Sequence, residues 1–152
     1  MPKVKKLMTK NVIKIDLQKT IFEAATLMKE KGVGCLVIID DKIPVGIVTE
    51  RDFVRRVVAN NLPSDIGISK IMSKPLITIE PDSSLREAAR LMLKKKIRKL
   101  PVVVEKKLVG IIVVSDFARQ LSKKTITEEI LEAMARYPAN EMGEKISFLS
   151  NI

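Results

Sequence analysis

The sequence predicts a mixed α/β (α+β) protein made of two copies of one strand–helix–strand–strand–helix unit, followed by a C-terminal helical tail. Two observations predict this. Residues 8–55 align with residues 72–119 without a gap, and both copies carry a glycine, an apolar run and an aspartate in the same register, Gly46 to Asp52 and Gly110 to Asp116. Such a repeat indicates a duplicated unit. Because one unit of roughly 50 residues buries little core by itself, we expect the two to pack through their sheets about a pseudo-two-fold axis.

Each unit opens with a short strand, predicted at 12–15 and 76–79, and continues with a helix that begins at a capping box. The boxes are Thr20-x-x-Glu23 and Ser84-x-x-Glu87, in which the hydroxyl accepts from the glutamate amide while the carboxylate accepts from the cap amide. Helical spacing then gives each helix one apolar face. These faces hold Ile21, Ala24, Ala25 and Met28, and Leu85, Ala88, Ala89 and Met92. The paired alanines predict close contact with a sheet.

A hairpin and a final helix complete each unit. The strands are predicted at 36–39 and 43–48, and again at 100–104 and 108–113, with tight turns between them. Their nearly continuous apolar runs predict sheets buried on both faces or nearly so. The final helices are expected over about 50–59 and 114–122. The predicted domains are therefore 8–60 and 72–122.

The remaining residues, 123–152, form the tail, which has no counterpart in the repeats. A helix is predicted over Thr125–Tyr137, stopped by Pro138. Its apolar residues either complete the core or form a self-association interface, and the interface is favoured.

The composition removes several kinds of chemistry. The chain of 152 residues has no histidine, which excludes Ser-His-Asp triads and histidine metal sites, and its single cysteine excludes an internal disulfide. No metal site and no catalytic cofactor are predicted. No apolar stretch approaches the roughly 20 residues that cross a membrane, and the N-terminus does not resemble a signal peptide. We expect a cytoplasmic protein without catalytic activity.

The net charge of +10 has two readings. It favours an anionic ligand or nucleic acid, but a lysine-rich solvated surface explains it equally well. The basic residues are spread along the chain, and aromatic residues, which stack on bases, make up 3% of it.

The order, spacing and duplication of these motifs resemble a tandem pair of CBS domains, a Bateman module. The resemblance covers about residues 8–122 and rests on Gly46-Ile-Val-Thr-Glu-Arg-Asp52, its partial copy Gly110-Ile-Ile-Val-Val-Ser-Asp116, the two helix openings and the run Lys99-Leu-Pro-Val-Val103. It implies a regulatory domain that binds an adenosine-containing ligand, such as AMP, ADP, ATP or S-adenosylmethionine. It also implies a homodimer of CBS pairs that acts on a separate effector protein.

The resemblance carries ligand roles onto particular positions. Ribose is expected at Asp52 and Asp116, with Thr49 beside the first. Phosphates are expected at Arg98, Lys99 and Arg51. The adenine is expected against apolar residues and backbone, namely Met8, Val12, Ile13, Leu36 and Ile38 in the first repeat, and Met72, Leu76, Ile77, Leu100 and Val102 in the second.

The chemistry of the strand-to-helix corner agrees with a ribose. A carboxylate in a first helical turn repels a phosphate but accepts two hydrogen bonds from a vicinal diol. Since Val113 replaces the threonine in the second copy, we expect the first site to bind about tenfold more tightly. The same Thr49-x-x-Asp52 pattern is also an ordinary helix cap.

Two further functions stay open at this stage. The first alternative to the regulatory module is a basic protein associated with nucleic acid. The second is a structural oligomerisation module whose ligand sites are vestigial.

Overall fold

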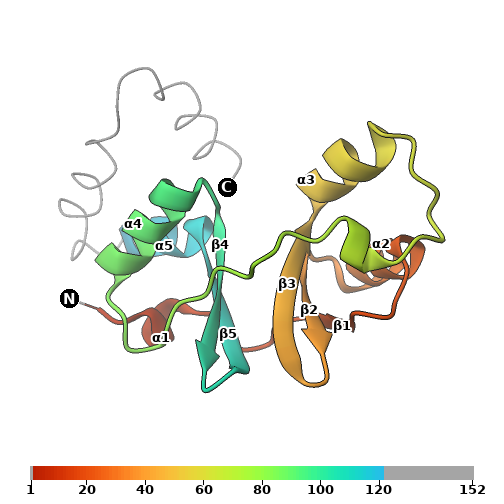
Figure 1. Cartoon of the computed structure of the whole chain (residues 1–152). Coiled ribbons are helices and arrows are strands. Elements are labelled where there is room, and N and C mark those ends of the chain that lie inside the picture. The colour runs from red at the N-terminus through yellow and green to blue at the C-terminus, as the bar shows by residue number, and fades with distance from the viewer. Residues whose placement is uncertain (1, 122–152) are drawn as a thin grey trace. The chain divides into compact units, whose positions relative to one another are not determined.

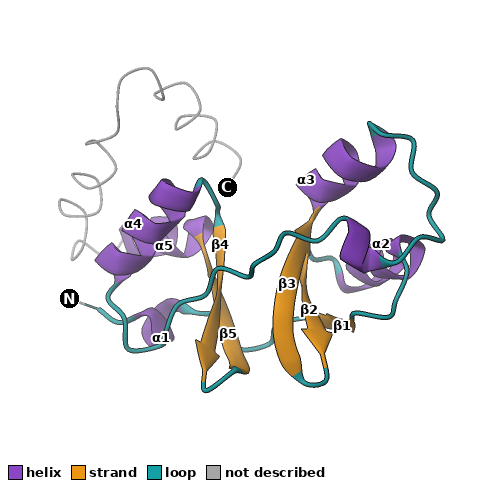
Figure 2. Cartoon of the chain, viewed as in Figure 1, coloured by secondary structure: helices purple, strands orange, loops and turns teal. Residues whose placement is uncertain are grey.

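The computed structural model describes residues 2–121, and the predicted C-terminal tail lies outside this range. The described chain divides into two compact units. One holds residues 11–77 and 105–108, and the other holds residues 2–10, 78–104 and 109–121. Each combines strands and helices (Figures 1 and 2), which confirms the mixed α/β class.

The first repeat forms a three-stranded sheet in the order β1-β2-β3. Strand β1 (Lys14–Asp16) pairs in parallel with β2 (Cys35–Asp40), which pairs antiparallel with β3 (Ile43–Thr49). Helix α2 (Ile21–Lys31) connects β1 to β2 and packs against β2. Three successive residues of β2, 36–38, are fully buried, so both faces of this strand are covered, as its apolar run predicted.

The second repeat forms a two-stranded sheet of β4 (Lys99–Val104) and β5 (Lys107–Val113), preceded by α4 (Leu85–Lys95) and followed by α5 (Val114–Leu121). The strand predicted at 76–79 was wrong. Residues 76–78 are irregular and Ile79 pairs with Val102 as an isolated parallel bridge. Pro75 and Pro81 flank this segment, and proline supplies no N–H to a strand ladder.

Both hairpins turn through two residues with positive φ, Asp41 and Lys42 in the first and Glu105 and Lys106 in the second. Positive φ at both central positions is the signature of the tight hairpin turns whose twist matches that of the strands. The predicted hairpins are therefore confirmed, with strand ends shifted by one residue.

Both predicted capping boxes are present. The Thr20 hydroxyl accepts from the Glu23 amide at 3.1 Å and the Glu23 carboxylate accepts from the Thr20 amide at 2.8 Å, and Ser84 and Glu87 repeat the arrangement. The two adjacent alanines are both buried in the second helix but not in the first. Ala88 and Ala89 are both buried, whereas Ala25 is exposed, so the prediction that Ala25 contacts a sheet was wrong.

The capping boxes make stability depend on acid pH. The bond from the Thr20 N–H, the largest influence, holds the pKa of Glu23 below its ordinary value of 4.5, and the Ser84 N–H does the same for Glu87. A carboxyl whose pKa is lowered on folding stabilises the protein above its unfolded pKa, and this contribution disappears as the pH falls through the folded pKa. We expect the stability gap between the wild type and the Glu23→Gln, Glu87→Gln variant to narrow between about pH 6 and about pH 3. Thermal unfolding at both pH values measures it, and a constant gap would contradict the assignment.

The final helix of the first repeat is wound differently from the prediction. A single α-helical turn, α3 (Glu50–Asp52), continues directly into a π-helix, η1 (Phe53–Val58), whereas α5 in the second repeat is α-helical. The amide of Ala59 accordingly donates to the carbonyl of Val54, five residues earlier. The prediction of helix over 50–59 was therefore right in extent and wrong in winding. π-Helical turns are rare and often mark functional sites.

The sequence pattern did not reveal two short segments, each of which precedes one repeat in the chain but packs in the unit of the other repeat. Helix α1 (Val4–Leu7) precedes the first repeat but belongs to the unit of the second, where Thr9 bridges Ile111. The 3-10 turn η2 (Ile68–Lys70) precedes the second repeat but belongs to the unit of the first, where Ser73 bridges Ile47. Figure 1 shows α1, in red, beside α4.

The position of these two segments explains why each motif begins with glycine. A Cβ placed on Gly46 would lie 2.6 Å from the Met72 sulfur, and one placed on Gly110 would lie 2.6 Å from the Met8 sulfur. The glycines therefore admit a methionine from the segment that crosses over. This corrects the predicted grouping of Met8 with the first repeat and of Met72 with the second, because each lies in the unit of the other.

Candidate functional site

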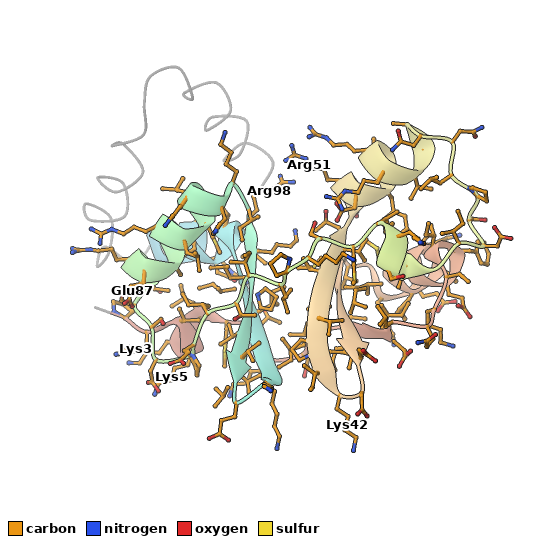
Figure 3. All side chains as sticks on the ribbon, viewed as in Figure 1. Lys3, Lys5, Lys42, Arg51, Glu87 and Arg98 are labelled. Carbon is orange, nitrogen blue, oxygen red and sulfur yellow. The ribbon has the colours of Figure 1, made fainter. Side chains whose placement is uncertain are left out.

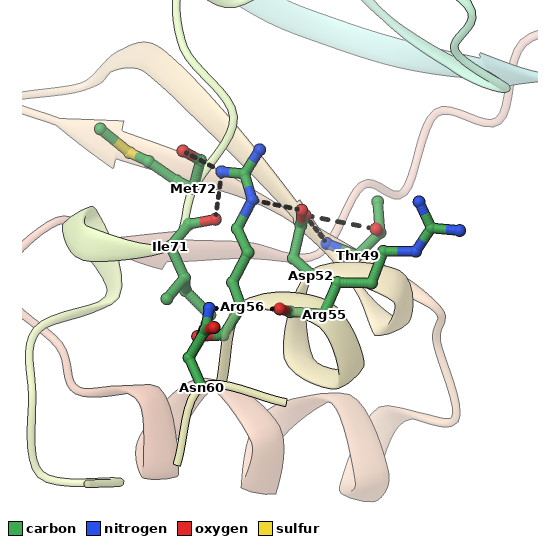
Figure 4. Close-up of polar contacts among 7 residues, drawn as sticks. All are labelled: Thr49, Asp52, Arg55, Arg56, Asn60, Ile71 and Met72. Carbon is green, nitrogen blue, oxygen red and sulfur yellow. Dashed lines mark hydrogen bonds and ion pairs between the residues drawn. The ribbon is translucent and has the colours of Figure 1, made fainter. Parts of the chain in front are cut away.

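The candidate site of the first repeat is the corner where β3 ends and α3 begins. Thr49 is the last residue of β3, and the Asp52 carboxylate turns back toward it. Asp52 Oδ2 accepts from the Thr49 N–H at 2.9 Å and from the Thr49 hydroxyl at 3.3 Å (Figure 4). The next amide, of Glu50, donates to the carbonyl of Gly34 at 3.1 Å. The first two amides of the corner are thus already bonded within the protein.

Asp52 is buried, with 8% of the residue exposed, and its carboxylate still has acceptor capacity. Its second oxygen, Oδ1, lies 3.5 Å from Arg56 Nε, an ion pair longer than an ordinary hydrogen bond. Each carboxylate oxygen has two acceptor positions. The corner therefore holds an oriented carboxylate that can accept a hydrogen bond at Oδ1 and, if the Thr49 hydroxyl rotates, a further one at Oδ2.

The corner of the second repeat keeps the same backbone frame. The Val113 N–H donates to Asp116 Oδ2 at 2.8 Å, and the Val114 amide donates to the Arg98 carbonyl at 2.9 Å. Replacement of threonine by Val113 thus removes the hydroxyl but not the amide bond to the carboxylate. Asp116 is 1% exposed, and Arg119 of the same helix is bonded to its Oδ1. This corner is more closed than the first.

The predicted adenine contacts fall into two groups. Leu36, Ile38, Leu100 and Val102 are fully buried, and this burial includes both main chain and side chain. Partly exposed side chains are found at Met8, Val12, Ile13, Leu76 and Ile77, while Met72 is buried beside Gly46. The role of all these residues toward a ligand stays a prediction.

Of the predicted phosphate contacts, Arg51 lies within the first corner, and the carbonyl of Arg98 accepts from the Val114 amide of the second corner. Arg51 stands between Thr49 and Asp52 and is exposed, whereas Arg98 and Lys99, at the start of β4, are half-buried. Figure 3 labels Arg51 and Arg98, each on its own unit. Their role toward a phosphate also stays a prediction.

One functional candidate was missed by the sequence reasoning. Arg56 of η1 contacts Asp52 and donates to the carbonyls of Ile71 at 3.0 Å and Met72 at 3.3 Å (Figure 4). Its spacing of four residues from Asp52 could have suggested the ion pair. The carbonyl contacts could not be predicted, because they join residues far apart in the chain.

The described part of the chain contains neither a candidate metal site nor a candidate membrane-spanning helix. Residues 2–121 contain no group of three or more histidine, cysteine, aspartate or glutamate side chains placed to hold a metal ion. Within the same range, each helix falls short of the length and apolar character needed to span a bilayer.

Comparison with known proteins identifies the repeats. A family model described as the CBS domain matches the chain twice, at residues 4–59 and 68–123. The chain is 36% identical over 126 residues to the CBS domain-containing protein YhcV of Bacillus subtilis, covering 82% of this chain and 90% of that protein. It is 44% identical over 101 residues to the uncharacterized protein MK0525 of Methanopyrus kandleri, of whose length the match spans 52%.

Solved structures agree with this comparison. A putative signal-transduction protein with CBS domains from Burkholderia ambifaria aligns with a TM-score of 0.75 at 29% identity, covering 84% of this chain and 99% of that one. The CBS domain pair of protein MJ0100, solved in complex with 5-methylthioadenosine and S-adenosyl-L-methionine, aligns with a TM-score of 0.73 at 28% identity. That alignment covers 82% of this chain and 98% of the MJ0100 chain.

Proposed function

Because the chain belongs to the CBS domain family and carries a tandem pair of its domains, we propose that it is a regulatory module that binds an adenosine-containing ligand through the corner of Thr49 and Asp52. The observation that carries this proposal is the oriented Asp52 carboxylate, whose Oδ2 is fixed by the Thr49 N–H and whose Oδ1 keeps acceptor capacity. A ribose diol supplies the two donors that such a carboxylate accepts. The adenosine ligands held by the MJ0100 domain pair support the same class of ligand.

The module acts by binding and not by catalysis. CBS-domain proteins are generally regulatory, and this sequence, without histidine, offers none of the nucleophile–histidine pairs of hydrolases. We further propose that the chain forms a homodimer of CBS pairs in the cytoplasm and signals to a separate effector protein. The ligand is AMP, ADP, ATP or S-adenosylmethionine.

A panel of ligands tests this function. AMP, ADP, ATP, NAD and S-adenosylmethionine are each added to the wild-type chain, and thermal unfolding is followed. A ligand present at about 100 times its dissociation constant stabilises the folded state by about 2.7 kcal/mol. For a chain of 152 residues, this corresponds to an increase of about 5–10 °C in the melting temperature. No increase with any of the five compounds would refute the proposed function.

The net charge of +10 supports a second candidate, association with nucleic acid. Binding to phosphates releases counterions, so the affinity would fall steeply with added salt. A titration with duplex DNA and single-stranded RNA at two salt concentrations separates this candidate from the first. If neither nucleic acid nor adenosine compounds bind, a structural oligomerisation module is left.

A further inference from the structure

Arg56 links the Asp52 carboxylate to a segment that follows the first repeat in the chain. Its Nε pairs with Asp52 Oδ1 at 3.5 Å, while its Nη1 donates to the carbonyls of Ile71 at 3.0 Å and Met72 at 3.3 Å. Figure 4 shows the guanidinium between the two groups. The planar fork of arginine suits this bridge, since lysine presents a single point of charge.

The backbone of Arg56 is also fixed. The side-chain amide of Asn60 donates to the carbonyls of Arg55 and Arg56, each at 3.3 Å. In the π-helical winding of η1 the amides bond five residues back, and the asparagine supplies donors at the end of that turn. Arg56 is therefore held at its main chain and at its guanidinium.

The segment at the other end of the bridge is packed against β3. Ile71 is fully buried, Met72 lies against Gly46, and Ser73 exchanges hydrogen bonds with Ile47 at 2.9 and 3.3 Å. A displacement of the Arg56 guanidinium would therefore act on residues that contact the strand leading to the corner. An ion pair of this length with a half-exposed arginine contributes little to stability, so its main consequence is the orientation of the carboxylate.

The second repeat is built differently at this point. When the gapless alignment of the repeats is extended by one residue, the position equivalent to Arg56 is Gln120. The Asp116 carboxylate is instead bonded to Arg119 of its own helix, α5. Within residues 2–121, a bridge from the motif aspartate to a following segment is therefore described for the first corner.

We propose that Arg56 is a positioning residue that holds Asp52 for a ribose-bearing ligand and couples occupancy of the corner to residues 71–73. The proposal rests on the proposed function, because it concerns the same site. Arg56 orients the Asp52 carboxylate through its ion pair with Oδ1. Its positive charge also reduces the repulsion between that carboxylate and a phosphate-bearing ligand. When a ribose hydroxyl donates to Oδ1, it shares that oxygen with Arg56, whose guanidinium stays bonded to the Ile71 and Met72 carbonyls, so occupancy of the corner acts on the segment packed against β3.

The test measures binding of AMP, ADP, ATP and S-adenosylmethionine by calorimetry to the wild type, Arg56→Gln and Arg56→Lys. Arg56→Gln places the residue of the second repeat in the first. We expect its dissociation constant to rise roughly three- to tenfold, the effect of losing one partly exposed charged contact. Arg56→Lys keeps the charge near Asp52 and should recover part of the loss. Arg55→Gln is the matched control, since it removes the same charge from the neighbouring position and should leave binding unchanged.

Hydrogen exchange separates positioning from a merely structural role. In the wild type, saturating ligand should slow exchange of the Ser73 amide, which donates to the Ile47 carbonyl. In Arg56→Gln, saturating ligand should leave that exchange rate unchanged, although the corner is occupied. If the wild type binds and Arg56→Gln binds equally well, or still transmits protection to Ser73, the inference is overturned. If the wild type binds none of the four compounds, the proposed function itself fails.

Discussion

Replacing Asp52 with alanine should raise the dissociation constant for an adenosine-containing ligand by about 100-fold, because two hydrogen bonds to a charged carboxylate are lost together. Calorimetric titration with the compound that most raises the melting temperature of the wild type measures this. The helix cap is lost as well, since Asp52 accepts from the Thr49 N–H at 2.9 Å. The variant should therefore also unfold more easily, by about 1 kcal/mol, while keeping the fold.

Two matched variants separate the ligand contact from the cap. Asp52→Asn keeps an acceptor for the Thr49 N–H but loses the charge, so it should retain stability better than affinity. Asp116→Ala removes the equivalent carboxylate from the more closed corner and should weaken binding less, because the Val113 corner has no hydroxyl beside it. A chain that carries both Asp52→Ala and Asp116→Ala should lose ligand stabilisation. If the ligand still raises its melting temperature, the assignment of ribose to these corners is contradicted.

Replacing Gly110 with alanine should lower the free energy of unfolding by about 2 kcal/mol, within the usual range for overpacking. The new Cβ would lie 2.6 Å from the Met8 sulfur and 2.9 Å from the carbonyl oxygen of Thr9. The sulfur ends a flexible side chain and can move. The carbonyl cannot move freely, because Thr9 and Ile111 exchange two backbone hydrogen bonds of 2.9 Å.

Gly46→Ala is the natural comparison, since its nearest backbone atom, the Ser73 carbonyl oxygen, lies farther away at 3.2 Å. Rotation of the Met72 side chain relieves the shorter contact, and alanine lowers the backbone entropy of the unfolded chain by roughly 0.5–1 kcal/mol. We expect this variant to be close to neutral. Chemical denaturation of both variants measures the difference. Adding Met8→Ala should not restore Gly110→Ala fully, and a full restoration would show that the sulfur alone is responsible.

Much of the fold followed from local patterns in the sequence. The capping boxes at Thr20 and Ser84 begin the helices where predicted, and the hairpin strands lie within a residue of their expected ends. These signals are local, since a cap joins residues three apart and an apolar run reports the burial of its own strand. The prediction was wrong where the two copies share a sequence pattern but differ in burial or in strand pairing. This is the case at Ala25, which is exposed, and at residues 76–79, which form no strand.

The candidate site was predictable in part for the same reason. Thr49 and Asp52 are three residues apart and contact each other directly, so their spacing indicated the corner. The bridge made by Arg56 was not predictable, because Ile71 and Met72 come close to it only through the path of the intervening chain.

The sequence by itself determined that this protein is a duplication in which a capped helix, a hairpin and a final helix recur, with two unequal strand-to-helix corners. It did so because secondary-structure periodicity, capping and turn residues are written over a few neighbouring positions. Only the tertiary structure decided that Met72 lies on Gly46 and Met8 on Gly110, that η1 is π-helical, and that Arg56 bridges Asp52 to the Ile71 and Met72 carbonyls. These features depend on which distant segments fill the space beside each strand, and close packing of the whole unit fixes that choice.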